Sequence, residues 1–237
     1  MLMKKLLRFA IVGSLLSLLT ASCASVQAPA PPAQDTGAKP AGGRDARTYL
    51  EQGNRFAAQG DDDRAIAAFN EALAINPKDA EAYNNRGVVY EYRRDHDRAV
   101  ADFTQAISLS NDYVEAYNNR GVAYKNKGDY DRAIDDFNKV LQLNPNLIIA
   151  YYNRGVAHQN KGSYTQAIAD FDKVLAVEPK DAVTYWSKAQ ACEKAGRSRE
   201  AATAYQRFVE YVEYAPAELK TYVGQAQQKI KVLQKKR

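Results

Sequence analysis

Cysteine, histidine and tryptophan are scarce in this chain of 237 residues, which holds two cysteines, two histidines and one tryptophan. Two cysteines, Cys23 and Cys192, are too few for a disulfide framework. No pair of His, Cys or acidic residues has the spacing of metal ligands, no nucleophile stands beside a recognisable base, and no glycine-rich phosphate loop occurs. We therefore expect no enzyme, no metal and no cofactor.

A strong excess of charge is also missing. The formal net charge is +5, and Lys4, Lys5 and Arg8 contribute +3 of it, so about +2 (5 − 3) remains from Cys23 onward. Basic and acidic residues are interleaved in that part, except for a short basic stretch at the C-terminus. This balance excludes nucleic acid as an expected partner.

Long apolar runs are absent except near the N-terminus, where Phe9 to Leu19 follow the three basic residues. These eleven residues are too few to span a bilayer, which takes about 20. The small residues before Cys23 resemble the lipobox of bacterial lipoproteins, whose cysteine is lipidated and becomes the new N-terminus. We expect a lipoprotein signal peptide at 1–22 and, because Ala24 follows the cysteine, anchoring in the outer membrane facing the periplasm; the alternative is an ordinary secretory signal.

Aromatic residues are missing from the next segment, which is rich in proline and alanine. Residues 24–44 hold four of the eight prolines of the chain. Such a composition cannot build a core, so we expect a lipid-anchored, extended tether over residues 23–45.

A period of 34 residues organises the remainder. YNNRGV occurs at 83–88 and again at 117–122, and YYNRGV follows at 151–156. Other residues keep the same step, namely Gly53, Gly87, Gly121 and Gly155; Ala65, Ala99, Ala133, Ala167 and Ala201; and Phe69, Phe103, Phe137, Phe171 and Tyr205. A fixed period of this size indicates stacked supersecondary units.

Each unit is predicted to be a hairpin of two amphipathic helices. Apolar residues recur at i, i+4 and i+7 in both halves of the unit at 80–113. The turn between them carries glycine followed by Asp or Ser, as in Gly162-Ser163, which suits a helix C-cap and the next N-cap. A glycine inside a helix costs about 1 kcal/mol relative to Ala. Gly121 and its equivalents therefore predict close approach of the partner helix, which we expect at its small alanine.

This grid of aromatic, Gly, Tyr, Ala, Phe, Ala and Pro resembles the tetratricopeptide repeat (TPR) family. The resemblance implies an all-α solenoid of helix hairpins, a right-handed superhelix. We expect five repeats with a capping helix and basic tail behind them, at 46–79, 80–113, 114–147, 148–181, 182–215 and 216–237.

The resemblance further implies a concave groove lined by the first helix of each repeat. Asn85, Asn119 and Asn153 would form a ladder there, whose amides bind the main chain of an extended peptide; the alternative is polar residues on a solvated surface. Helix geometry adds their neighbours on the same face. The other predicted groove residues are Glu81, Val88, Tyr92, Glu115, Val122, Asn126, Ile149, Tyr152, Val156 and Asn160; Ile149 takes the position of Glu81 and Glu115.

Several further residues are given structural roles. Three arginines precede three aspartates by sixteen residues, which predicts ion pairs within hairpins. These pairs are Arg86 with Asp102, Arg120 with Asp136, and Arg154 with Asp170. His96, His158 and Cys192 are expected in packing, and the run Asp61 to Asp63 as a helix cap in preference to a calcium site. Trp186 is either an interface anchor or covered by the C-terminal cap.

What the resemblance implies about function is a membrane-tethered adaptor or scaffold that holds a protein or peptide partner, in cell-envelope assembly or in the regulation of peptidoglycan enzymes. Three alternatives stay open. They are a pilotin-like assembly factor, an accessory subunit of an envelope enzyme, and a homo-oligomer in which another copy fills the groove.

Overall fold

The computed structural model describes residues 45–215 and 217–235. The signal peptide expected at 1–22, the lipidated Cys23 and all but the last residue of the tether expected at 23–45 lie outside these described residues. No helix among those described is both long enough and apolar enough to cross a membrane.

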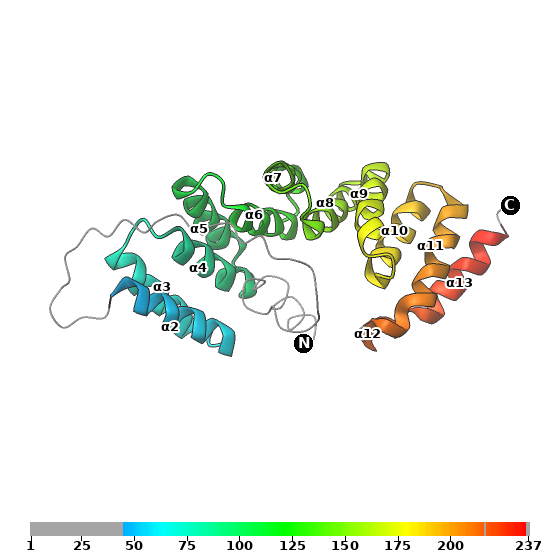
Figure 1. The fold of residues 1–237 in the computed structure, drawn as a ribbon. Helices are drawn as coiled ribbons and strands as arrows, with labels where there is room; N and C mark the ends of the chain where they lie inside the picture. Colours follow the sequence, from blue (N-terminus) through cyan, green and yellow to red (C-terminus); the bar gives the residue numbers. More distant parts are fainter. Residues whose placement is uncertain (1–44, 216, 236–237) are drawn as a thin grey trace. The chain divides into compact units, whose positions relative to one another are not determined.

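Helices dominate the described residues, which contain no β-strand. They follow one another as pairs of helices of 13 or 14 residues (Figure 1). The pairs are α2 (Ala46–Gln59) and α3 (Asp62–Ile75), α4 (Ala80–Tyr92) and α5 (His96–Leu109), α6 (Val114–Asn126) and α7 (Tyr130–Leu143), α8 (Ile148–Lys161) and α9 (Tyr164–Val177), α10 (Ala182–Lys194) and α11 (Ser198–Tyr211). The prediction of an all-α chain of five helix pairs is confirmed.

The helices form two compact units. The first ends at Asp95 and contains α2 to α4, and the second begins at His96 and contains α5 onward. Within the first unit α3 packs against both α2 and α4. Within the second, each helix from α6 to α10 packs against the helix before it and the helix after it. Within each unit, stacking on neighbouring helices thereby buries a face that an isolated hairpin would leave exposed.

One aromatic ring from each second helix fills the core. Phe69 in the first unit, and Phe103, Phe137, Phe171 and Tyr205 in the second, are at most 1% exposed. These are the residues of the aromatic series with the 34-residue step. The period of the sequence therefore corresponds to the spacing of core rings within the second unit.

The helical glycines lie against these rings. A Cβ atom on Gly121 would come 2.8 Å from Cε1 of Phe137, and one on Gly155 would come 2.8 Å from Cε1 of Phe171. Close approach of the partner helix is thus confirmed, but the prediction that the glycines face alanine is wrong. Their neighbour is phenylalanine, because its flat ring needs the space that a Cβ would occupy.

The turns within the hairpins use glycine for its backbone conformation. Gly60, Gly128, Gly162 and Gly196 have φ between +74° and +87°, the left-handed region that favours glycine. Gly60 and Gly162 are the C-caps of α2 and α8. The second repeat has Arg94 at the equivalent position, and its φ is +62°. An arginine here adopts a conformation that L-residues disfavour.

Aspartate side chains begin many of the helices. Asp61 accepts a hydrogen bond from the backbone N of Arg64 at 3.2 Å, and Asp129 accepts one from that of Arg132 at 3.2 Å. The helix-cap interpretation of the run that begins at Asp61 is confirmed at that residue. Ser163 is the N-cap residue of α9, as predicted, but its side chain makes no cap hydrogen bond there.

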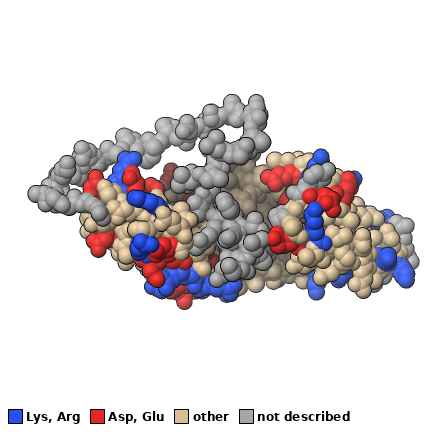
Figure 2. Space-filling model, turned by 90° about the horizontal axis from the view of Figure 1, so that it is seen from below, with Lys and Arg blue, Asp and Glu red and all other residues tan. Residues whose placement is uncertain are grey.

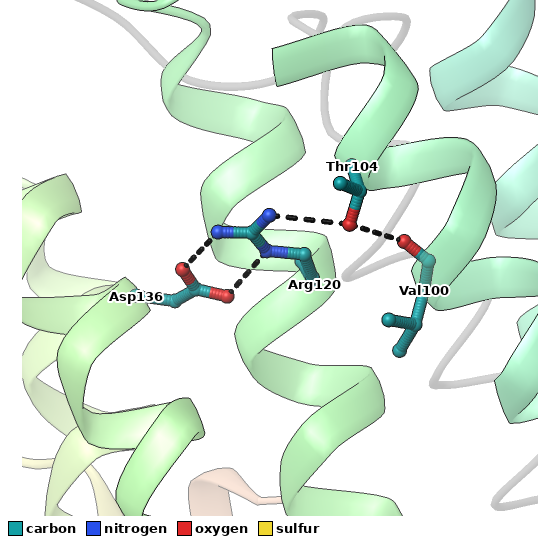
Figure 3. Close-up of polar contacts among 4 residues, drawn as sticks. All are labelled: Val100, Thr104, Arg120 and Asp136. Carbon is teal, nitrogen blue, oxygen red and sulfur yellow. Dashed lines mark hydrogen bonds and ion pairs between the residues drawn. The ribbon is translucent and has the colours of Figure 1, made fainter. Parts of the chain in front are cut away.

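Two of the predicted arginine–aspartate pairs are present in the second unit. Arg120 donates from Nε and Nη2 to the two carboxylate oxygens of Asp136 at 2.9 and 2.7 Å (Figure 3). Arg154 and Asp170 repeat this geometry at 2.9 and 2.6 Å. Both aspartates are 5% exposed, so these are nearly buried ion pairs. The third predicted pair, Arg86 with Asp102, has one member in each unit.

The same arginines also bond to the preceding repeat, which was not predicted. The remaining nitrogen of Arg120, Nη1, donates to Oγ1 of Thr104 on α5 at 3.2 Å (Figure 3). Arg154 donates likewise to Asn138 on α7 at 2.7 Å. At the equivalent position of the fifth repeat, Lys188 forms an ion pair with Asp172 on α9 at 2.5 Å. Each of these side chains therefore joins its own repeat to the one before it.

A second set of ion pairs ties repeats together at the hairpin turns. Lys127 pairs with Asp97, and Lys161 with Asp131, within the second unit. In the first unit Arg93 pairs with Asp63. In each case the cation follows the acid by 30 residues, and the acid lies near the start of the preceding second helix.

The C-terminal segment packs on the last repeat. After a short 3₁₀ turn come α12 (Ala217–Lys220) and α13 (Val223–Gln234), and α13 packs against α11. Ala226 and Leu233 of α13 are buried against the core of the fifth repeat. The expected cap is therefore present, but as two helices in place of one.

Candidate functional site

The exposed part of the predicted groove is smaller than helix geometry alone suggests. Of its residues, five are exposed: Glu81, Glu115, Asn126, Ile149 and Asn160. Four are half-buried: Asn85, Tyr92, Tyr152 and Val156. The remaining four are buried: Val88, Asn119, Val122 and Asn153.

The asparagine ladder is largely enclosed. Asn119 is 6% exposed and Asn153 is 8% exposed, so the expectation that their amides face solvent is wrong. Nδ2 of Asn153 donates to Oδ1 of Asn118 at 3.3 Å, which connects α8 to α6. In the first unit Nδ2 of Asn85 donates to Oδ1 of Asn54 at 2.9 Å, which connects α4 to α2. These amides join neighbouring first helices, and peptide binding by them stays a prediction.

At one position of the first helices, asparagine is replaced by an aromatic residue toward the C-terminal end of the second unit. Tyr152 and Trp186 occupy the position of Asn118 in the fourth and fifth repeats. The ring of Tyr152 lies 6.0 Å from that of Phe171, and its hydroxyl lies 3.5 Å from Oγ of Ser187 on α10. Burial raises the pKa of the Tyr152 phenol. The ring therefore packs as an apolar surface between two first helices.

Trp186 is held among aromatic rings. Its ring centroid lies 5.4 Å from that of Tyr205, 5.0 Å from Phe208 and 5.1 Å from Tyr222. Tyr222 belongs to the C-terminal segment, so this segment partly covers the indole. Of the two interpretations of Trp186, the geometry favours a packed residue under the C-terminal cap.

His158 and Cys192 have the packing roles expected of them. Cys192 is fully buried, and burial raises the pKa of its thiol to about 11. His158 is half-buried, and its Nδ1 is enclosed without a hydrogen-bond partner. Burial lowers the pKa of this imidazole. Over residues 45–215 and 217–235, no group of three or more His, Cys, Asp or Glu side chains is arranged to hold a metal ion.

Charges of both signs are interspersed on the surface. Figure 2 shows Lys and Arg next to Asp and Glu over the face that it displays, without a large field of one sign. Many of these neighbours are exposed ion pairs along one helix, such as Arg207 with Glu210 at 2.8 Å. Such pairs contribute little to stability. Surface charge therefore does not single out a binding face, and the first helices differ from the rest of the surface by their pattern of polar and apolar residues.

Two family models described as tetratricopeptide repeats match the chain. One matches residues 80–113, 114–147 and 148–181, and the other matches residues 53–91. Together they span residues 53–181, which is more than half of the 237 residues. No curated protein matches the chain.

Many solved structures have a similar fold, and two of them serve as examples. A crystal structure of the protein MamA is 26% identical, covering 71% of this chain and 92% of that one, with a TM-score of 0.66. The crystal structure of YrrB, described as a TPR protein with an unusual peptide-binding site, is 19% identical. It covers 76% of this chain and 92% of that chain, with a TM-score of 0.65.

Proposed function

Since the chain belongs to the tetratricopeptide repeat family, we propose that it is an adaptor that binds a protein or peptide segment along its first helices. Glu115, Ile149 and Asn160 carry the proposal, because they are exposed on this face although their helices pack closely on both sides. Side chains spared from packing on a regular stack are free to contact a partner. A peptide-binding site is described for YrrB, a protein of the same fold.

The cellular setting is part of the proposal and rests on the N-terminal sequence. A basic stretch, a mostly apolar segment of eleven residues and small residues before Cys23 support a lipidated cysteine in the cell envelope. The adaptor would then act at the outer membrane, facing the periplasm, in envelope assembly or in the regulation of peptidoglycan enzymes. Cys23→Ala should move the protein from the membrane fraction to the soluble fraction. Unchanged fractionation would refute the anchor but leave the binding proposal intact.

Photo-crosslinking in cells tests the binding surface. A photoreactive residue at Asn160, which is exposed on α8, should capture a partner, whereas one at Lys173, exposed on α9, should not. Asn160 is a better probe position than the enclosed Asn119. Strong crosslinks from Lys173 with none from Asn160 would reject the first helices as the binding face. Crosslinks between two copies of the chain would support the homo-oligomer alternative.

A further inference from the structure

Two positions on the first helices change character between the third and fourth repeats. The first is glutamate in Glu81 and Glu115 but becomes Ile149 and Val183. The second is asparagine in Asn84 and Asn118 but becomes aromatic in Tyr152 and Trp186, whose side chains pack against the core of the fifth repeat. The face of α8 and α10 is therefore apolar where the corresponding part of α6 is polar.

Ile149 is placed in solvent without a packing reason. It is 41% exposed. The equivalent residues of the second and third repeats are Glu81 and Glu115, so the fold does not require an apolar side chain at this position. Leu147, two residues earlier, is explained by packing, because it contacts the cluster around Leu141. A single exposed apolar side chain is ordinary on a protein surface, so Ile149 points to a contact site only together with apolar neighbours.

Val183 occupies the position of Ile149 on α10, the neighbouring first helix. The helices α8 and α10 meet where the hydroxyl of Tyr152 approaches Ser187. Ile149 precedes Tyr152 by three residues and Val183 precedes Ser187 by four, so each lies about one turn N-terminal to this contact on the same helix face. The two aliphatic side chains therefore border the same stretch of surface, with the Tyr152 ring next to them.

A shallow hollow lies beside Val183. It has a volume of about 400 Å³ and is lined by the loop at 178–181, by Ala182 and Val183, and by Ala215. Its walls combine apolar side chains with the carboxylates of Glu178 and Asp181 and with the ammonium group of Lys180. The hollow is large enough to receive one apolar side chain of a peptide.

Carboxylates border this surface. Glu115 is exposed on α6, and Glu178 is exposed in the loop before α10. Among the described residues neither has an ion-pair partner. Asp181 adds a third negative charge while it caps α10 through the backbone N of Val183 and Thr184. The loops and helix starts at 110–115, 144–149 and 178–183 hold a single cation, Lys180.

We propose that Ile149, Val183 and the hollow beside Val183 form a subsite for an apolar side chain of the partner, and that Glu115 and Glu178 select a Lys or Arg next to it. The occupant is thus a short protein segment in which an aliphatic or aromatic residue adjoins a basic one. This rests on the proposed function, since it assigns the chemistry of the segment that the first helices bind.

Selection of random linear peptides displayed on phage, with the purified full-length protein as target, tests this assignment. The peptides enriched should combine Leu, Ile, Val or Phe with Lys or Arg. Synthetic copies are then measured by fluorescence anisotropy. Ile149→Glu and Val183→Glu introduce glutamate, the residue that the third repeat has at this position as Glu115. Each should weaken binding by roughly tenfold or more. Glu115→Gln should weaken binding less and reduce its salt dependence.

Val232→Glu is the matched control, because Val232 is 48% exposed on α13, outside the subsite. It should change the affinity by less than about twofold. Enriched peptides that are acidic, or that bind the Ile149→Glu and Val183→Glu variants as tightly as the unchanged protein, would overturn the subsite but leave peptide binding standing. Failure to enrich any peptide would reject the proposed function together with the subsite.

Discussion

Arg120 and Asp136 are joined by two parallel hydrogen bonds, while the third nitrogen of the guanidinium donates to Thr104 (Figure 3). One side chain of α6 therefore contacts both second helices that flank it, α5 and α7. The hydrogen bond to Asp136 raises the pKa of Arg120, whereas burial raises the pKa of Asp136 against the opposing effect of the arginine. Loss of the arginine would leave a nearly buried carboxylate without its counter-charge.

Arg120→Ala is expected to lower the free energy of unfolding by about 3 kcal/mol, because removal of one partner of a buried pair costs more than the pair contributes. Urea unfolding followed by circular dichroism measures this. Arg207→Ala, which removes an exposed pair, should cost less than about 1 kcal/mol. Equal losses in the two variants would contradict the role given to the Arg120 pair. Partner binding at Ile149 should persist in Arg120→Ala wherever the protein is folded.

Gly121→Ala is expected to destabilise the protein by about 2 kcal/mol, because the added Cβ would overlap the buried ring of Phe137. Gly224→Ala is the matched control, since no atom lies within 4 Å of the Cβ that would be added there. In that variant the higher helix propensity of alanine should keep the melting temperature equal or raise it. The contact with Phe137 would be unimportant if both variants behaved alike.

Arg94→Gly should raise the free energy of unfolding by about 1 kcal/mol, because glycine adopts a positive φ without the penalty that arginine has. Gly128→Ala makes the opposite change at the equivalent turn, where φ is +82°, and should lose a similar amount. Thermal unfolding of both variants checks the pair of predictions. A lower melting temperature for Arg94→Gly would show that its side chain contributes more than its backbone costs.

The stability of the protein should depend on pH through His158. Burial lowers the pKa of this imidazole below its ordinary value of 6.5. At pH values around and below 6.5 the unfolded chain therefore binds more protons at His158 than the folded chain does. The contribution of neutral His158 is therefore present above about pH 6.5 and is lost as the pH falls toward the lower pKa of the folded state. His158→Tyr, which introduces the residue found at Tyr124, should make the melting temperature fall less between about pH 7.5 and about pH 5.5. Identical pH profiles would assign the dependence to other groups.

The sequence predicts well those features that depend on a single repeat. The 34-residue step places the turn glycines and the core phenylalanines, because each follows from local propensity and from the amphipathic period. The pairing of Arg154 with Asp170 was also predictable, since both residues lie in one hairpin. The subsite at Ile149 has a sequence signal as well, namely an apolar residue where other repeats have glutamate.

Contacts between repeats were harder to predict. The bond from Arg154 to Asn138, the pair of Lys161 with Asp131, and the burial of Asn153 all depend on how far one hairpin is rotated and shifted relative to the next. A period in the sequence does not fix that geometry. The sequence did contain an indication of the bond from Arg154 to Asn138. One repeat position always holds a hydrogen-bond acceptor, namely Thr104, Asn138 or Asp172, but the sequence does not show that the arginine of the next repeat is its donor.

The buried thiol of Cys192 allows the opening of the fifth repeat to be measured by thiol labelling. With Cys23 replaced by alanine, Cys192 is the single remaining thiol of the chain. It is fully enclosed and its pKa is about 11, so a thiol-specific reagent reacts with it only after the helices around it separate. The labelling rate then measures how often the C-terminal repeat opens. A peptide bound across α8 and α10 would slow that rate, which gives a readout of occupancy that needs no dye on the ligand.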